Sequence, residues 1–206
     1  MANKKYKERD GVRHLTDANT NKIMEAVKMI LEALGDDPTR PGLVETPRRV
    51  AGFYDEVFEG MRYTNDEIAV KFNKCFEESD AHDLVLMKDI DAFSFCEHHI
   101  ALMYNIKIHV AYIPDGRVIG LSKIARIVDM VTKRLQLQER IVEDIASIME
   151  SILNTHNVMV VMEGEHSCMT ARGIKKPGAV TCSAVCHGVF DVNHTLRKEV
   201  YSLIKE

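Results

Sequence analysis

The stretch Phe95-Cys96-Glu97-His98-His99 brings a thiol, a carboxylate and two imidazoles into four consecutive positions. Cys96 and His99 have the C-x-x-H spacing, so a single tight turn can direct a sulfur and a ring nitrogen towards one point. Tetrahedral zinc binds such ligands at about 2.0 to 2.3 Å. Two ligands do not complete a zinc site, and the chain contains no C-x-x-C pair that would supply more. The motif therefore predicts part of a metal site, with a third ligand elsewhere in the chain.

The best candidate for the third ligand is Cys168, which lies in the stretch Glu163-Gly164-Glu165-His166-Ser167-Cys168-Met169. There a second cysteine and a second histidine lie two residues apart. Cys96, His99 and Cys168 would together form a Cys2His site with one position left open for water. Such a site is typical of catalytic zinc, whereas structural zinc usually has four protein ligands.

The two remaining histidines of these clusters, His98 and His166, would then be free to carry protons. Two alternatives remain open. In the first, the cysteines are inert core thiols and the histidines are structural, hydrogen-bonded residues. In the second, Cys96 is a nucleophile that a neighbouring histidine activates without any metal, which would leave the second cysteine without a role.

The composition describes a chain that can bury one substantial core, because 46% of its 206 residues are hydrophobic. The formal net charge of -4 and the pI near 6.1 argue against a nucleic-acid or anionic-membrane partner. The N-terminus carries no apolar signal core, and no apolar run reaches the ~18 residues that a membrane span requires. We therefore expect a cytoplasmic protein.

The five cysteines are an odd number in a chain without an export signal. This pattern indicates free thiols or metal ligands rather than a disulfide framework. Cys182 and Cys186 are an even number of positions apart in an apolar run with strand-like character, so we expect both to be buried core residues.

Helical periodicity dominates the first part of the chain. Apolar residues between positions 23 and 34 recur at the i, i+3, i+4, i+7 spacing, where Thr20 or Asn21 can cap the start and Gly35 can end the helix. Thr46-Pro47 is typical of the cap and first position of a second helix.

From residue 82 onwards the periodicity changes to two, which indicates strands. Residues 104–112 predict a half-buried strand, and Pro114-Asp115-Gly116 predicts a hairpin turn to a short return strand at 118–120. Two helices, the first capped by Ser122, a second pair of strands and a C-terminal helix follow. This order favours an α+β domain with a largely antiparallel sheet. The expected parts are a flexible tail at residues 1–20, an N-terminal helical region at 21–80 and a catalytic domain at 81–206.

Basic residues near one helix start indicate an anion site. Ser122, Lys123 and Arg126 occupy the first turn, where free N–H groups and the helix dipole favour a phosphate. Arg172, four residues after Cys168, and Arg49 could complete this site. The alternative is that the helix residues form an ordinary solvated face.

Gln138-Glu139 is a second candidate for substrate recognition. An ionised glutamate only accepts hydrogen bonds, so Glu139 fits the two adjacent N–H donors on the edge of a purine. The alternative is that Glu139 forms half of a surface ion pair.

Taken together, these residues resemble the GTP cyclohydrolase I family over nearly the whole chain from the first helix onwards. Several motifs in the right order carry the resemblance, and together they are more specific than any one. They are Phe95-Cys96-Glu97-His98-His99, Gly120-Leu121-Ser122-Lys123-Ile124-Ala125-Arg126-Ile127-Val128, Gln136-Leu137-Gln138-Glu139-Arg140, and Glu165-His166-x-Cys168-Met169 with Arg172-Gly173.

The resemblance implies a tunnelling fold, in which an antiparallel sheet and two long helices are preceded by an N-terminal helical extension. It implies a ring-stacked homodecamer with active sites shared between subunits, and one Zn²⁺ per subunit held by Cys96, His99 and Cys168. A non-catalytic purine- or pterin-binding oligomer with the same fold and metal is the alternative within this resemblance.

The resemblance also implies a reaction. Zinc would activate a water molecule for attack on C8 of the guanine ring of GTP, while His98 and His166 move protons. Formate would leave, and 7,8-dihydroneopterin triphosphate would form as the first product of tetrahydrofolate or other pteridine synthesis. Glu139, with Gln138 beside it, would hold the pyrimidine edge of guanine. The triphosphate would be held by Ser122, Lys123, Arg126, Arg172 and Arg49.

Overall fold

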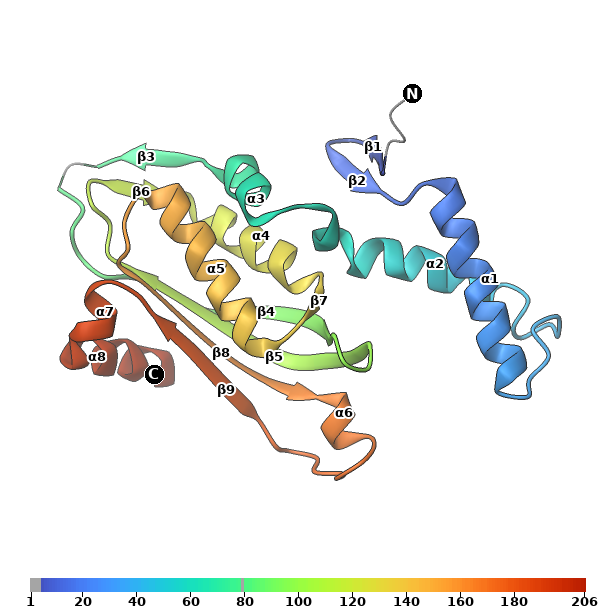
Figure 1. Cartoon of the computed structure of the whole chain (residues 1–206). Coiled ribbons are helices and arrows are strands. Elements are labelled where there is room, and N and C mark those ends of the chain that lie inside the picture. Colours follow the sequence, from blue (N-terminus) through green and yellow to red (C-terminus); the bar gives the residue numbers. More distant parts are fainter. Residues whose placement is uncertain (1–4, 79) are drawn as a thin grey trace. The chain divides into compact units, whose positions relative to one another are not determined.

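The computed structural model describes residues 5–78 and 80–206. The chain divides into two compact units, the first ending at Arg62 and the second running from Tyr63 to Glu206 (Figure 1). From the sequence we expected this boundary near residue 80. The second unit therefore includes a helix and a strand that had been assigned to the N-terminal helical region.

The first unit combines a small hairpin with two helices. An ion pair between the buried Arg62 and the half-buried Asp55 stabilises it, with the guanidinium 2.6 Å from the carboxylate. The same carboxylate contacts the His14 ring at 2.8 Å, which joins the hairpin to the second helix. The elements are β1 (Lys7–Arg9), β2 (Val12–His14), α1 (Asp17–Ala33), α2 (Thr46–Val57) and the 3₁₀ helix η1 (Glu59–Arg62).

The start of the chain differs from the expected tail. Strands β1 and β2 pair antiparallel through a two-residue turn at Asp10-Gly11, where both residues have positive φ. That dipeptide is a strong hairpin signal, which the polar composition of the strands concealed. Helix α1 begins at Asp17, and the Thr16 side chain caps it by accepting a hydrogen bond from the Asn19 N–H. The first four residues of the expected tail lie outside the described residues.

The second unit is built on a five-stranded sheet with the order β7-β4-β5-β8-β9. All neighbouring strands are antiparallel except β7, which pairs parallel to the end of β4. The α+β class and the largely antiparallel sheet are therefore confirmed. The strands of the second unit are β3 (Cys75–Glu77), β4 (Val85–Cys96), β5 (Ala101–Tyr112), β6 (Arg117–Ile119), β7 (Leu135–Gln136), β8 (Val158–His166) and β9 (Thr181–Cys186). Its helices are α3 (Asn65–Phe72), α4 (Leu121–Thr132), α5 (Gln138–Leu153), α6 (Ser167–Thr170), α7 (Val189–Val192) and α8 (His194–Lys205).

The core of this unit lies mainly on one face of the sheet, where α4 and α5 lie across the strands (Figure 1). Ile108 and Val110 of β5 point to this face and are fully buried beneath the two helices. Ala111, between Val110 and Tyr112, points to the opposite face and packs with Phe190 of α7 and Val200 of α8. The alternation follows from the two-residue period of a strand, so the last residues of β5 contribute to the apolar clusters on both faces.

Helix α5 shows why the sequence pattern predicted a helix here. Ile141, Ile145, Ile148 and Ile152 recur on one side, and all are at most 1% exposed. The helix ends at Asn154, whose φ of 54° is the left-handed conformation typical of a helix end. The two long helices expected in this domain are thus confirmed.

Two local predictions about this unit are wrong. Strand β6 does not return along β5 but pairs with β3, with Cys75 opposite Ile119. Both edges of β5 are already occupied by β4 and β8, so no position remains for a return strand. Ser122 does not cap α4 either, because the cap residue is Gly120 and no side chain caps that end.

The expected burial of the two late cysteines is also not found. Cys182 is exposed and Cys186 is only half-buried. Both cysteines lie on the same face of β9, where Cys186 packs against the cluster that contains Phe190 and Val200 and Cys182 lies outside that cluster. No helix in the described part of the chain is long and apolar enough to cross a membrane.

Candidate active site and metal centre

The first half of the site is the turn between β4 and β5. Cys96 is the last residue of β4. Its carbonyl accepts a hydrogen bond from the N–H of Ile100, four residues later, and this bond closes the turn. Ile100 has a φ of 51°, which lets the chain reverse so that Ala101 pairs directly with Cys96. The turn places the His99 Nδ1 atom 3.8 Å from the Cys96 Sγ atom.

The second half of the site comes from the strand on the other side of β5. Strand β8 pairs with β5 so that His166 lies opposite Met103, and α6 follows directly with Cys168. The Cys96 sulfur, the Cys168 sulfur and one His99 ring nitrogen all lie within 4.8 Å of one another. The sheet order β4-β5-β8 therefore brings together three side chains that are up to 72 positions apart in the sequence.

This donor set fits zinc. Thiolate and imidazole are the ligands that zinc selects, whereas magnesium and calcium prefer oxygen. Burial raises the pKa of the Cys168 thiol, and the neighbouring Cys96 raises it further. A bound cation reverses this effect, because metal binding displaces the thiol protons. Cys96 is buried and Cys168 half-buried, while His99 is exposed, so the cluster is reachable from one side.

The two predicted proton carriers flank this cluster in different surroundings. His98 is exposed and its ring lies edge-on to that of His99, with the ring centres 6.2 Å apart. His166 is half-buried at the end of β8, and burial lowers the pKa of its imidazole. The neutral form of His166 is therefore favoured near neutral pH, as a proton acceptor requires.

Gln138 is placed differently from the expectation that it lies beside Glu139 on a guanine edge. It is the first residue of α5 and is only 2% exposed. Its side chain lies inside the protein, where its Oε1 atom is 2.8 Å from the His166 Nε2 atom. Glu139, the next residue, is exposed, and no described residue forms an ion pair with it.

The ion pair in this region belongs instead to the next residue along the helix. Arg140 donates to the Glu97 carboxylate at 2.7 Å, joining the start of α5 to the turn that carries Cys96 and His99. The Arg140 guanidinium lowers the pKa of the Glu97 carboxyl. The Glu97 N–H also donates to the Gln136 carbonyl at 3.1 Å, so the turn is held from β7 as well.

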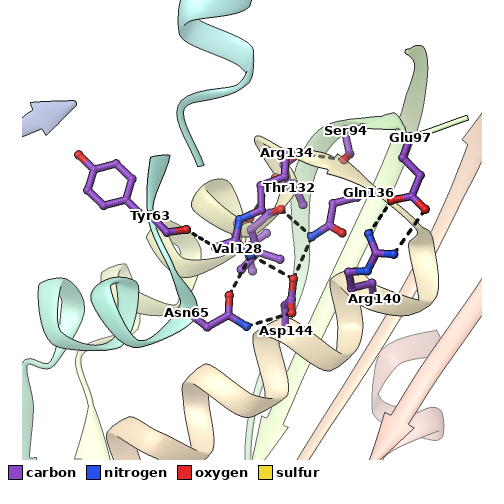
Figure 2. Close-up of polar contacts among 11 residues, drawn as sticks. Tyr63, Asn65, Ser94, Glu97, Val128, Thr132, Arg134, Gln136, Arg140 and Asp144 are labelled. Carbon is purple, nitrogen blue, oxygen red and sulfur yellow. Dashed lines mark hydrogen bonds and ion pairs between the residues drawn. The ribbon is translucent and has the colours of Figure 1, made fainter. Parts of the chain in front are cut away.

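A polar network behind β7 supports this arrangement (Figure 2). The Asp144 carboxylate accepts hydrogen bonds from Arg134 at 3.1 Å, from Gln136 at 3.0 Å and from Asn65 at 2.9 Å. Arg134 also donates to the Asn65 side chain and to the Tyr63 carbonyl. The network thereby connects the segment before α3, the short strand β7 and helix α5. Of these residues, only Gln136 lies in a motif noted in the sequence, and no motif had indicated the others.

We expect Asp144→Ala to lower the free energy of unfolding by about 3 kcal/mol, because breaking a buried pair leaves a charge without its counterion. The Arg134 and Asp144 side chains are 14% and 17% exposed, and burial already lowers the pKa of Arg134. Glu97→Ala removes the same type of partner from the more exposed pair with Arg140 and should lower the free energy of unfolding much less. Urea unfolding of both variants measures the difference, and equal losses would contradict this role of the network.

The predicted phosphate residues are not all near the metal cluster. The carbonyl of Thr132, at the end of α4, accepts a hydrogen bond from Ser94, two residues before Cys96. Ser122 and Lys123 lie at the other end of this 12-residue helix, which spans about 18 Å. Figure 1 shows α4 running from β6 to β7. Within one chain, these residues and Arg126 are therefore not assembled with the metal ligands.

The other two predicted phosphate residues lie in different parts of the chain. Arg172 follows α6 and lies close enough to lower the pKa of Cys168. Arg49 lies in α2 of the first unit, so its part in the site stays a prediction.

Comparison with known proteins extends these observations to the whole chain. The sequence model of the GTP cyclohydrolase I family matches residues 23–205. The chain belongs to the GTP cyclohydrolase I family. It is similar to GTP cyclohydrolase 1 of Clostridium acetobutylicum, with 55% identity over 91% of this chain and 98% of the relative.

Further relatives give the same result. GTP cyclohydrolase 1 of Ruminiclostridium cellulolyticum is 54% identical over 89% of this chain and 97% of its own length. GTP cyclohydrolase 1 of Clostridium botulinum strain Kyoto is 54% identical over 88% and 95%. The mixed fold with its antiparallel sheet is consistent with the tunnelling fold of the GTP cyclohydrolase I family, and the Cys96, His99 and Cys168 cluster fits the family's zinc cofactor.

Proposed function

We propose that this chain is a zinc-dependent GTP cyclohydrolase, which opens the imidazole ring of guanine in GTP, releases formate and forms 7,8-dihydroneopterin triphosphate. The reaction would be the first step of tetrahydrofolate or other pteridine synthesis. The observation that carries the proposal is the convergence of Cys96, His99 and Cys168 beside His98 and His166. Membership of the GTP cyclohydrolase I family supports GTP as the substrate.

The three ligands have the chemistry that this reaction needs. Zinc bound by Cys96, His99 and Cys168 supplies a Lewis acid that makes water nucleophilic near neutral pH. The exposed side of the cluster, at His99, leaves an approach for the substrate. His98, beside His99, and His166 carry protons between water and the purine.

The guanine ring is oriented by a carboxylate in this proposal. Glu139 lies in the first turn of α5, is exposed, and is near enough to His166 to influence the pKa of that imidazole. Its two oxygens accept the adjacent N–H groups on the pyrimidine edge of guanine. Arg172, close to Cys168, binds a phosphate oxygen, and Arg49 remains a further candidate for this role.

We further propose that the active site is completed by a second copy of the chain, within a homo-oligomer for which a decamer is the expected size. Ser122, Lys123 and Arg126 lie in the first two turns of α4, whose start has no side-chain cap, and this suits a triphosphate. Because they lie at the far end of α4 from their own metal cluster, they serve the cluster of a neighbouring subunit.

Co-assembly of two inactive variants tests the shared site. We expect Cys168→Ala and the double variant Lys123→Ala with Arg126→Ala each to be inactive when assembled alone. Mixed oligomers obtained by co-expression should recover about a quarter of wild-type turnover, because that share of sites combines two intact halves. The fraction of each variant is determined by mass spectrometry. Activity no greater than the sum of the separate variants would show that each site comes from one chain.

The reaction itself is tested by incubating the purified protein with GTP and measuring formate together with the fluorescence of the oxidised pterin. The proposal predicts both products in equal amounts. Binding of GTP without formate would instead support the non-catalytic purine-binding alternative. The matched control is ATP, which lacks the 2-amino group and the N1–H that Glu139 is proposed to bind, and which should give neither product.

A further inference from the structure

Gln138 is a buried polar residue whose whole amide group is hydrogen-bonded inside the protein. Its Nε2 atom donates to the Thr181 carbonyl at 2.8 Å and to the Met162 carbonyl at 3.4 Å. Its Oε1 atom lies 2.8 Å from the His166 Nε2 atom. The residue thus joins the start of α5 to β8, β9 and one of the two candidate proton carriers.

The two carbonyl groups fix which way the amide faces. A carbonyl oxygen can only accept a hydrogen bond, so Thr181 and Met162 both require the NH2 group of Gln138 on their side. The amide oxygen is therefore left to face His166. An oxygen acceptor at 2.8 Å requires that the His166 Nε2 atom carries a hydrogen. The opposite tautomer would bring two lone pairs together at this distance.

The consequence concerns the other ring nitrogen. No described residue forms a hydrogen bond with the His166 Nδ1 atom. With Nε2 held as a donor, Nδ1 is the only ring atom that can accept a proton.

We propose that Gln138 is a positioning residue that holds His166 in the Nε2–H tautomer, so that the lone pair of Nδ1 is the one left available to the substrate. This inference rests on the proposed cyclohydrolase function for its catalytic consequence. It replaces a direct contact between Gln138 and guanine, because both ends of the amide are already occupied within the protein. Glu139, one residue later, keeps the role of binding guanine.

Kinetics of the zinc-loaded full-length protein separate these two roles. Gln138→Met keeps the length of the side chain but removes its polar atoms, and it should lower kcat by about 100-fold, in the range of lost acid–base catalysis. KM for GTP and the zinc content should change less than about twofold, because neither substrate nor metal is contacted. Glu139→Gln, the matched control, should mainly raise KM. A Gln138→Met variant with raised KM and unchanged kcat would overturn the proposal.

A conservative variant and a spectroscopic measurement exclude a merely structural role. Gln138→Glu keeps an acceptor oxygen towards His166 but loses the donor to Thr181 and Met162, so it should recover part of the kcat that Gln138→Met loses. Solid-state ¹⁵N NMR of histidine-labelled, zinc-loaded protein reads the tautomer directly, with the His166 signal identified by its loss in His166→Gln. The wild type should show the Nε2–H form, and Gln138→Met a mixture or the Nδ1–H form.

The Nδ1–H form in the wild type would contradict the proposal. The spectrum is recorded without GTP, so it decides the tautomer even if GTP turnover fails, in which case only the proposed function is rejected.

Discussion

Cys168→Ala is expected to lose bound zinc and GTP turnover together. Cys168 supplies one of the three donor atoms that lie within 4.8 Å of one another, and its removal leaves only Cys96 and His99. Two ligands do not hold zinc against water, because catalytic sites require three protein ligands. Changes to residues that only support a metal ligand already cost about 10- to 100-fold in affinity or activity, so loss of a ligand should exceed 100-fold.

The matched control for this prediction is Cys182→Ala, which makes the same chemical change at an exposed cysteine of β9. It should keep both zinc and turnover at the wild-type level. Metal analysis of the two variants alongside formate release gives the comparison. If Cys168→Ala retained a full complement of zinc, the assignment of the third ligand would be wrong.

His98→Ala has the second largest expected effect: it should keep zinc but lower turnover by about 10² to 10⁴-fold, the range of general acid–base catalysis. His98 adjoins the ligand His99 but is not among the three grouped donor atoms. The loss should therefore appear in kcat with little change in zinc content. Formate release under saturating GTP and metal analysis of the same sample measure both quantities.

His156→Ala provides the control, because His156 has a side chain that is 87% exposed and lies between α5 and β8, outside the cluster. Its turnover should match the wild type. Zinc loss in His98→Ala as complete as in Cys168→Ala would show that the division into ligands and proton carriers is mistaken.

The metal ligands could be predicted because their signal is local. Cys96 and His99 are three residues apart, so one turn decides their geometry. Cys168 required the further step that two cysteine–histidine clusters share one site. A cysteine and a histidine that are close in sequence do not by themselves indicate a metal site. Cys186 and His187 are adjacent, and yet His187 contacts Glu150 at 2.9 Å, outside the grouped donors.

The strand pairings were less predictable because they depend on competition between segments. The turn at Pro114-Asp115-Gly116 has the composition of a hairpin, but β5 already has a neighbour on each side, so β6 pairs with β3. The exposure of Cys182 also depends on other segments, since nothing in the apolar run around it indicates that the cluster formed by α7 and α8 covers Cys186 but not Cys182.

The supporting contacts of the polar residues could not be predicted from the sequence. Asp144 lies eight positions after Gln136, and its other partner Asn65 is 79 positions away. Gln138 was noticed, but its position beside Glu139 suggested a substrate contact. Only the fold shows that the first residue of α5 points into the protein towards His166.

The central claim is that turnover depends on zinc held by Cys96, His99 and Cys168. The most direct measurement is to remove the metal with a strong chelator, confirm its absence, and then follow formate release from GTP while zinc is added back in steps. The account predicts that turnover stops on removal and returns in proportion to zinc, reaching its plateau at about one ion per chain. Formate release that continues in fully zinc-free protein would contradict the account and would favour Cys96 as a nucleophile.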